Sequence, residues 1–209
     1  MEYKDKQIQI IETAERLFAQ KGFAGTSVRD IAEEAGVNLA MISYYFGSKE
    51  KLMEALFEHR SVNIRMQVDK LLKDQSLSPF DRINILVDDF IERSFQREPF
   101  YKIMTCELLM EKNQFILDLL TDVKVRNAQI VSELIKDGQD KGVFKKDADV
   151  IFLLNTMSGT ITHMLISRRY YKEYNNLQNM PDEQFQQEFK QSVSTYIKSL
   201  FKAMLVYEA

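Results

Sequence analysis

Two short stretches with helical spacing of apolar residues flank a tight turn near Gly36, and this feature constrains the fold more than any other. Ala32 stands where the two helices would cross, and a larger side chain there would push them apart. Gly36 allows the positive φ that the turn requires. Ile42, six residues later, would point inward and seal the pair. The spacing predicts a helix-turn-helix, although any tight corner between two helices also favours a small residue and a glycine.

The segments around this corner carry helix start and stop signals. Gly22 can close the first helix in a left-handed conformation. Either Thr26 or Ser27 can cap the second helix, and Asp30 would complete a capping box with Ser27. Asn38 can cap the third. The predicted helices in this part of the chain cover residues 7–21, 28–35 and 39–45, followed by a long helix from Lys49 through Leu52, Leu56, Ile64, Val68 and Leu71.

The rest of the chain repeats the helical period at greater length. No stretch alternates at period two, and only seven glycines and three prolines occur in 209 residues. Both observations favour an all-α fold over a turn-rich β architecture. We expect one domain over residues 1–60 and a second over 61–209. The further predicted helices start at Pro79 and Phe100, cover 113–137 and 149–171, and follow Pro181 to the end.

The stretch TSVRDIAEEAGVNLAMISYYFGSKEKL, Thr26 to Leu52, resembles the DNA-binding segment of the TetR family of bacterial transcriptional regulators. Its most specific part is YYFGSKE, and the preceding AERLFAQKGFAGTS resembles the family's first helix and its Gly-Phe corner. Later, only long helices and the link KDGQDKGVFKKDAD are similar. The resemblance implies a three-helix head that binds double-stranded DNA and a helical body that binds an effector and dimerises.

The recognition helix would be residues 39–45, with its exposed side chains facing base edges in the major groove. The outward positions lack Arg, Gln and Asn, which make bidentate base contacts. Readout would therefore use thymine methyl groups, hydroxyls and DNA shape. Ala40 stands where the family often has Gly or Pro, and Ser43 where it often has Tyr, which puts the operator sequence in doubt.

Phosphates would be held by helix starts and by nearby donors. The expected DNA-binding residues are Thr26, Ser27, Arg29, Asn38, Leu39, Ala40, Met41, Ser43, Tyr44, Tyr45 and Lys49. Residues 1–60 nevertheless hold eight basic and ten acidic side chains, a net charge of −2. Nonspecific affinity should be modest, so two heads must act together on a palindromic operator with half-sites about 34–36 Å apart, or a multiple of that distance.

The last two helices are the expected homodimer interface. Ser158, Gly159 and Thr160 would let another backbone approach closely, and the final helix carries an apolar stripe from Phe185 to Met204. Two such helices from each subunit could form a four-helix interface, as in the resembling family. The alternative is that both helices serve only the core of one chain.

A small apolar or amphipathic effector would bind in the centre of the chain, as in the resembling family. The candidate lining consists of large, adaptable side chains and one histidine: Phe100, Met104, Leu108, Met110, Phe115, Met157, His163 and Met164. Methionines at helical spacing are also common in plain cores, and His163 could equally be a hydrogen-bonded interface residue. The leading hypothesis is a homodimeric repressor that a small-molecule effector releases from its operator. Two hypotheses compete with it: an architectural DNA-binding protein of the same fold without an effector, and a ligand-binding or partner-binding bundle with a vestigial helix-turn-helix.

Other classes of function find little support in the sequence. There is no Gly-rich phosphate loop or catalytic motif, so we expect neither an enzyme nor a cofactor. Two histidines far apart in sequence make a metal site unexpected. Cys106 is the only cysteine and no export signal precedes the first helix, which favours a reducing cytoplasm. The uncharged stretch 150–167 is too rich in polar residues for a membrane span, so we expect no membrane contact.

Overall fold

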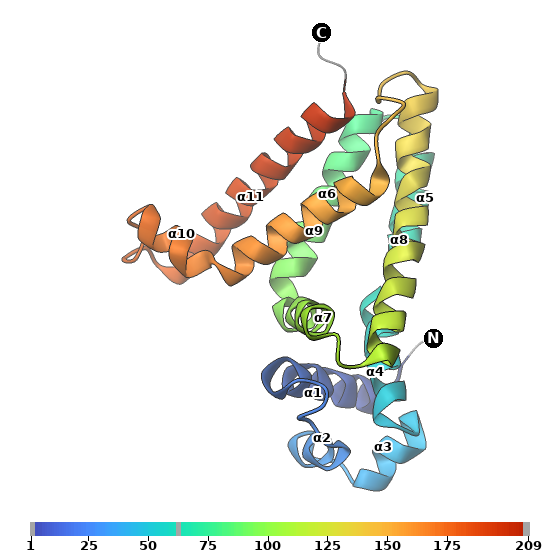
Figure 1. The fold of residues 1–209 in the computed structure, drawn as a ribbon, viewed down its shortest axis with the longest axis vertical. Helices are drawn as coiled ribbons and strands as arrows, with labels where there is room; N and C mark the ends of the chain where they lie inside the picture. Colours follow the sequence, from blue (N-terminus) through green and yellow to red (C-terminus); the bar gives the residue numbers. More distant parts are fainter. Residues whose placement is uncertain (1–2, 62–63, 207–209) are drawn as a thin grey trace. The chain divides into compact units, whose positions relative to one another are not determined.

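The computed structural model describes residues 3–61 and 64–206, and in these ranges it consists of helices joined by turns and loops, with no strand (Figure 1). The all-α prediction is confirmed. The helices are α1 (Asp5–Lys21), α2 (Val28–Glu34), α3 (Leu39–Phe46), α4 (Lys49–Ser61), α5 (Ile64–Lys73), α6 (Pro79–Gln96), α7 (Glu98–Met110), α8 (Gln114–Asp140), α9 (Val150–Ile166), α10 (Arg168–Tyr174) and α11 (Asp182–Leu205).

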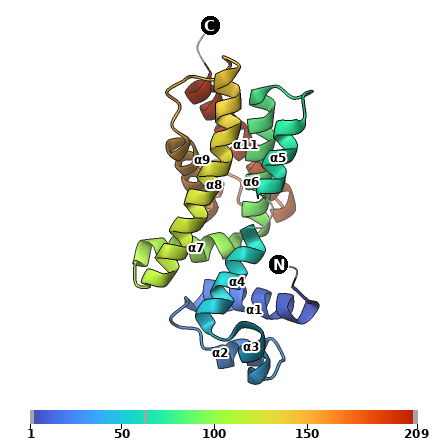
Figure 2. The ribbon, with the colours of Figure 1, turned by 90° about the vertical axis from the view of Figure 1, so that its right-hand side faces the viewer.

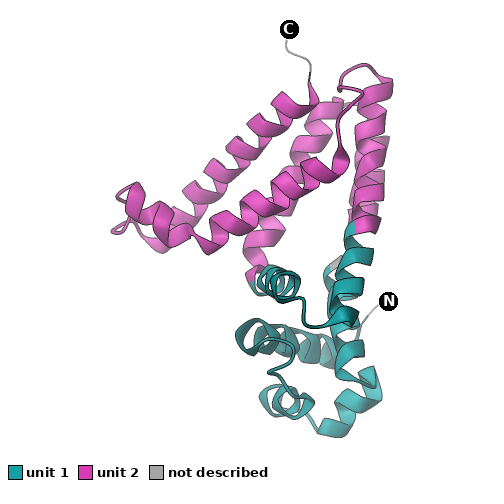
Figure 3. Cartoon of the chain, viewed as in Figure 1, with its two compact units in different colours: residues 1–63, 99–124 teal, residues 64–98, 125–209 magenta. Residues whose placement is uncertain are grey.

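The helices group into two compact units that do not coincide with a single cut in the chain (Figure 3). Unit 1 combines the described residues up to Ser61 with Pro99–Lys124, and unit 2 combines Ile64–Glu98 with the residues from Val125 onward. Unit 1 thus contains the described part of the predicted domain 1–60 together with a later segment of the chain. An apolar stripe reveals that a helix face is buried, but it does not reveal which other helix covers that face.

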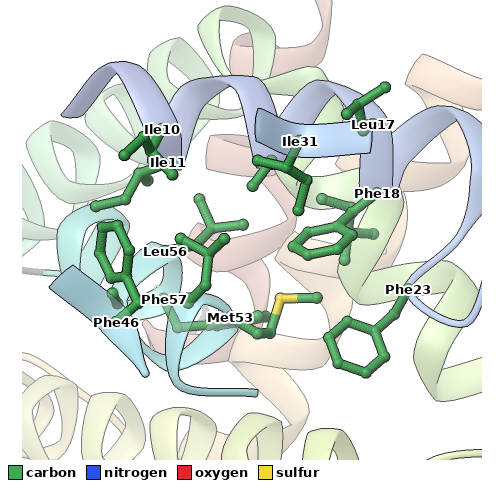
Figure 4. Close-up of a cluster of buried hydrophobic side chains, with 14 of the residues drawn as sticks. Ile10, Ile11, Leu17, Phe18, Phe23, Ile31, Phe46, Met53, Leu56 and Phe57 are labelled. Atoms are coloured by element: carbon green, nitrogen blue, oxygen red, sulfur yellow. The ribbon is translucent and has the colours of Figure 1, made fainter. Parts of the chain in front are cut away.

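The core of unit 1 contains side chains from α1 to α4 together with α7 and the first turns of α8 (Figure 4). Ile10, Phe18 and Leu56 are buried where α1 packs on α4. Phe57 of α4 meets Phe100 of α7 with ring centroids 5.0 Å apart. The helix-turn-helix is thus braced by α1 and α4, and α7 shares its core.

The core of unit 2 is formed by α5, α6, α9 and α11 with the second half of α8. On α11, the rings of Phe185 and Phe189 stack with centroids 5.1 Å apart. Arg82 of α6 is buried, and its guanidinium donates to Asp137 of α8 at 2.7 Å and to the carbonyl of Asp74 at 2.8 Å. Figure 2 gives a second view of these helices.

One predicted helix differs from those observed, and another is described only in part. The long helix expected from Lys49 is described as α4 and α5, and residues 62–63 between them lie outside the described residues. The helix expected over 149–171 breaks at Ser167, where α9 and α10 meet at a bend of 70°. At this break both the amide and the hydroxyl of Ser167 donate to the carbonyl of His163, at 2.9 and 2.7 Å. Such side-chain competition for backbone groups ends or bends helices.

Within 3–61 and 64–206, no single helix is long and apolar enough to cross a membrane. Only α9 and α10 taken together reach that length and composition, and they do so as the bent pair.

Candidate nucleic-acid interface

The second helix of the head starts at the predicted capping box. The amide of Asp30 donates to Ser27 Oγ at 3.1 Å, and the amide of Ser27 donates back to Asp30 Oδ2 at 2.8 Å. Hydrogen bonds from the backbone and hydroxyl of Ser27 hold the pKa of the Asp30 carboxyl below its ordinary value. Two amides without helical partners are satisfied in this way, so the start of α2 is locally determined.

The turn after α2 also has the predicted geometry. Gly36 has a φ of 60°, and the amide of Val37 donates to the carbonyl of Ala32 at 3.0 Å. Ala32 is buried, as expected at the crossing of two helices. On the far side of the corner, Gln9 of α1 donates its side-chain amide to the carbonyl of Ala35 at 2.9 Å. α1 thus braces the end of α2 directly.

The third helix presents one face inward and the other to solvent. Asn38 Oδ1 accepts from the amide of Ala40 at 2.9 Å, which starts the helix at the predicted cap. Ile42 and Phe46 are only 1% and 8% exposed, whereas Leu39 and Tyr44 are 41% and 83% exposed. An exposed N-terminal face of this kind is what a helix needs to enter a major groove.

Seven of the predicted DNA-contact residues are exposed: Ser27, Arg29, Asn38, Leu39, Ala40, Ser43 and Tyr44. Met41 and Tyr45 are half-buried, and the ring of Tyr45 lies 5.2 Å from that of Tyr44. These positions share the solvent side of α2 and α3, and their contact with DNA stays a prediction.

Two predicted phosphate donors point elsewhere. Thr26 is 1% exposed, and its hydroxyl donates to the carbonyl of Gly22 at 2.9 Å. The ammonium of Lys49 donates to the carbonyls of Phe23 and Thr26, each at 2.9 Å, and lies 4.3 Å from the centroid of the Phe23 ring. Neither side chain is therefore free to reach phosphate in this structure. A long flexible side chain takes its direction from tertiary neighbours, which the sequence motif does not specify.

Several further residues hold the head together and were not singled out from the sequence. Glu15 of α1 is buried and forms an ion pair with Arg60 of α4, whose Nε donates to Glu15 Oε2 at 3.0 Å. Glu107 of α7 accepts from the amide of Phe23 at 3.4 Å. Glu15 carried a weak signal, because a charged residue on the apolar stripe of a helix needs a partner.

Six of the eight predicted effector residues contribute to the two hydrophobic cores. Phe100, Met104, Leu108 and Phe115 pack in the core of unit 1, and Met157 and Met164 pack in unit 2. Met110 and His163 are exposed. One hollow lies beside α1 around Gln9 and Thr13, and another lies beside α9 around Asp149 and Phe152; the residues that line these two hollows do not include the eight. The core packing of six of these residues agrees with the alternative that the sequence left open, and their contact with an effector stays a prediction.

Within residues 3–61 and 64–206, no group of three or more His, Cys, Asp or Glu side chains is arranged to hold a metal ion.

The segment that contains α2 and α3 is similar to known proteins. The sequence profile of the family described as "Bacterial regulatory proteins, tetR family" matches residues 10–56, which include α2, α3 and the corner between them. The "Probable HTH-type transcriptional regulator YttP" of Bacillus subtilis is 64% identical over 53 residues, 25% of this chain and 24% of that protein. The "HTH-type transcriptional repressor NicS" of Pseudomonas putida is 32% identical over 144 residues, 66% of this chain and 65% of that protein. The chain thus spans less than two thirds of the length of either relative.

The fold similarity extends further along the chain. The solved structure of the "fatty acid degradation regulator FadR from Bacillus halodurans" superposes with a TM-score of 0.76 and covers 96% of both chains, at 19% sequence identity. At that identity, the match describes the architecture and leaves specificity open.

Proposed function

The chain belongs to the TetR family of bacterial regulatory proteins, and from this premise we propose that it acts as a homodimeric repressor on a palindromic DNA operator. It is a transcriptional regulator, and such a protein works on the chromosome in the cytoplasm. The observation that carries the proposal is the orientation of α3, whose cap and buried face fix Leu39, Ser43 and Tyr44 outward.

The exposed face of α3 suits a particular mode of readout. Leu39 and Ala40 can contact thymine methyl groups, and the hydroxyls of Ser43 and Tyr44 can donate to base edges or phosphates. Arg29, on the neighbouring α2, supplies a positive charge at the surface. The lack of bidentate donors on α3 means that DNA shape should contribute much of the specificity.

The proposed dimer uses the exposed faces of α9 and α11. No charged residue occurs between Val150 and Ser167, and Phe152 and Ile166 are among the exposed apolar side chains of α9. A Cβ added at Gly159 would meet no heavy atom within 4 Å, so a second backbone could approach there. The outer face of α11 carries small or hydroxyl-bearing side chains: Ser192, Thr195, Tyr196, Ser199 and Ala203. Because residues 1–60 have a net charge of −2, two linked heads are needed for useful affinity.

Release by a small apolar or amphipathic effector completes the proposal. An effector would act by binding better to a state whose heads do not match the two half-sites. Long-chain fatty acids are reasonable first compounds, because the Bacillus halodurans protein with this fold is named for fatty acid degradation. A rise in melting temperature together with loss of DNA binding would identify an effector.

A second candidate is an architectural DNA-binding protein of the same fold that needs no effector. The dense packing of Phe100 and Ile103 in unit 1, and of Met157 in unit 2, favours this candidate. DNA binding that no apolar compound reverses would support it, and a compound that releases DNA at stoichiometric concentration would exclude it.

DNA binding is tested by footprinting on the region upstream of the gene for this chain, followed by mobility-shift assays on the protected segment. Tyr44→Ala should weaken binding by about tenfold or more, because a contact of this kind contributes about 1–3 kcal/mol in each head. Tyr174→Ala is the matched control, since Tyr174 is also strongly exposed but lies on α10. Equal binding by the wild type and Tyr44→Ala, or the absence of any protected palindrome, would reject the assigned surface.

A further inference from the structure

The side chain of Lys49 crosses the base of the helix-turn-helix. The segment from Ser27 to Ser48 contains α2, α3 and their caps, and Lys49 is the residue that follows it. Its ammonium reaches back to the carbonyls of Phe23 and Thr26, in the turn that precedes the segment. One cation therefore joins the two ends of the DNA-binding motif.

The Lys49 ammonium is held by two carbonyl oxygens and an aromatic ring. Two of its three donors are engaged at 2.9 Å, and the Phe23 ring lies beneath it at 4.3 Å from the centroid. That ring is buried and packs against Phe18 at 5.3 Å, so the ring is fixed from below. Charge-assisted hydrogen bonds and a cation–π contact together hold the ammonium in one place.

The turn itself depends on these contacts. The carbonyls of Phe23 and Thr26 lie outside any helix. The Phe23 carbonyl also accepts from the amide of Thr26 at 3.3 Å, so the Thr26 carbonyl depends more on Lys49, and a carbonyl without a partner near a protein core is costly. The amide of Phe23 donates to Glu107 of α7 at 3.4 Å, so the backbone of Phe23 is held through both its N–H and its C=O group. Gly25 lies close to the end of α1, because a Cβ added there would lie 2.3 Å from the carbonyl oxygen of Lys21.

We propose that Lys49 is a positioning residue, which closes the helix-turn-helix by clamping the turn before α2 and does not itself contact phosphate. The proposal rests on the DNA-binding function proposed above. Loss of the clamp would let the start of α2 shift, and α3 is attached to α2 through the short turn at Gly36. A small shift of α3 would misalign its exposed face with base edges, although no contact to DNA had been removed.

The test separates a clamp from a phosphate contact by the salt dependence of binding. Each phosphate contact contributes about 0.9 to the slope of log K against log salt, so removing one from each head should reduce the slope by about 2. Removing a clamp lowers affinity without changing the slope. The variant is Lys49→Met, which keeps the length of the stem and removes the donors.

For full-length Lys49→Met we expect a lower melting temperature, at least about tenfold weaker operator binding and an unchanged salt slope. Amide hydrogen exchange should become faster in residues 23–47 and stay unchanged in α11. Lys51→Met is the control, because Lys51 is exposed on the same helix and forms an ion pair with nearby Glu54 at 2.6 Å. That variant should keep the wild-type melting temperature. A slope reduced by about 2, with wild-type stability and exchange, would overturn the proposal.

If Lys49→Met does not fold, Lys49→Arg provides the second test. A guanidinium keeps the charge but is planar and broader, so it cannot occupy the same site between two carbonyls and the ring. We expect lower stability and weaker binding with an unchanged slope, whereas wild-type stability and affinity would overturn the clamp. Should the wild type bind no duplex, the proposed function fails, and the melting and exchange measurements still decide whether the clamp exists.

Discussion

The uncharged face of α9 yields a sharp prediction at Gly159. In one chain, a Cβ at this position meets nothing within 4 Å, so a larger residue fits without rearrangement. Gly is about 0.8–1 kcal/mol less favourable than Ala in a helix interior, and Arg is close to Ala. If α9 faced only solvent, Gly159→Arg would therefore stabilise the chain by about 0.5–1 kcal/mol and raise its melting temperature by roughly 1–4 °C.

The proposed dimer reverses this expectation. A guanidinium at position 159 would be buried between two closely approaching backbones, on a helix stretch without any charged partner from Val150 to Ser167. An unpaired buried charge costs about 3–5 kcal/mol. The dimer should then dissociate about 100-fold more readily or worse. Gly159→Ala is the matched variant, which adds helix propensity without charge or bulk.

Sedimentation equilibrium of the wild type and both variants measures the dimer constant, and melting at several protein concentrations provides the second readout. We expect Gly159→Arg to be monomeric, with a melting temperature that no longer depends on concentration, and Gly159→Ala to remain largely dimeric. A Gly159→Arg variant that dimerises with the wild-type constant would refute the assignment of α9 to the interface.

Three other consequences can be checked on the same protein. Gly138→Ala places a Cβ 2.1 Å from a ring carbon of buried Phe144. Chemical denaturation should therefore show that the free energy of unfolding falls by about 1–3 kcal/mol. Arg60→Leu leaves the buried carboxylate of Glu15 without its partner and should lower the free energy of unfolding by about 3–5 kcal/mol. The double variant with Glu15→Leu should restore most of this loss. A loss below about 1 kcal/mol would show that the pair is equivalent to a surface ion pair. Because the pKa of Asp30 is lowered in the folded head, the ionised carboxylate stabilises the folded state. This stabilisation is present above the ordinary pKa of 3.8 and is lost as the pH falls through the lower folded pKa. Asp30→Asn should therefore flatten the acid limb of a stability–pH curve, and an unchanged limb would contradict this.

The parts of the head that were predictable from sequence depend on local chemistry. The caps at Ser27 and Asn38 and the positive-φ glycines Gly22 and Gly36 each satisfy or close a helix within a few residues. These signals need no knowledge of the distant chain, and they were enough to orient α3.

The parts that could not be predicted depend on contacts between distant segments. Thr26 and Lys49 carry polar groups that suit phosphate, but the turn at Phe23 uses both internally. From the sequence, Phe100 and Met104 suit a ligand pocket and a hydrophobic core equally well. In the structure they pack against α1 and α4 in the core of unit 1. The break at Ser167 is a local effect that was missed, because one hydroxyl in an apolar helix is a weak signal.

The most direct test of the central claim is photo-crosslinking from the outer face of α3. A benzophenone amino acid placed at Tyr44 should crosslink to the protected operator on ultraviolet irradiation, and excess unlabelled operator should abolish the product. The same probe at Tyr174, on α10, should give no crosslink. If the probe at Tyr174 reacts with DNA and the probe at Tyr44 does not, α3 is not the recognition helix.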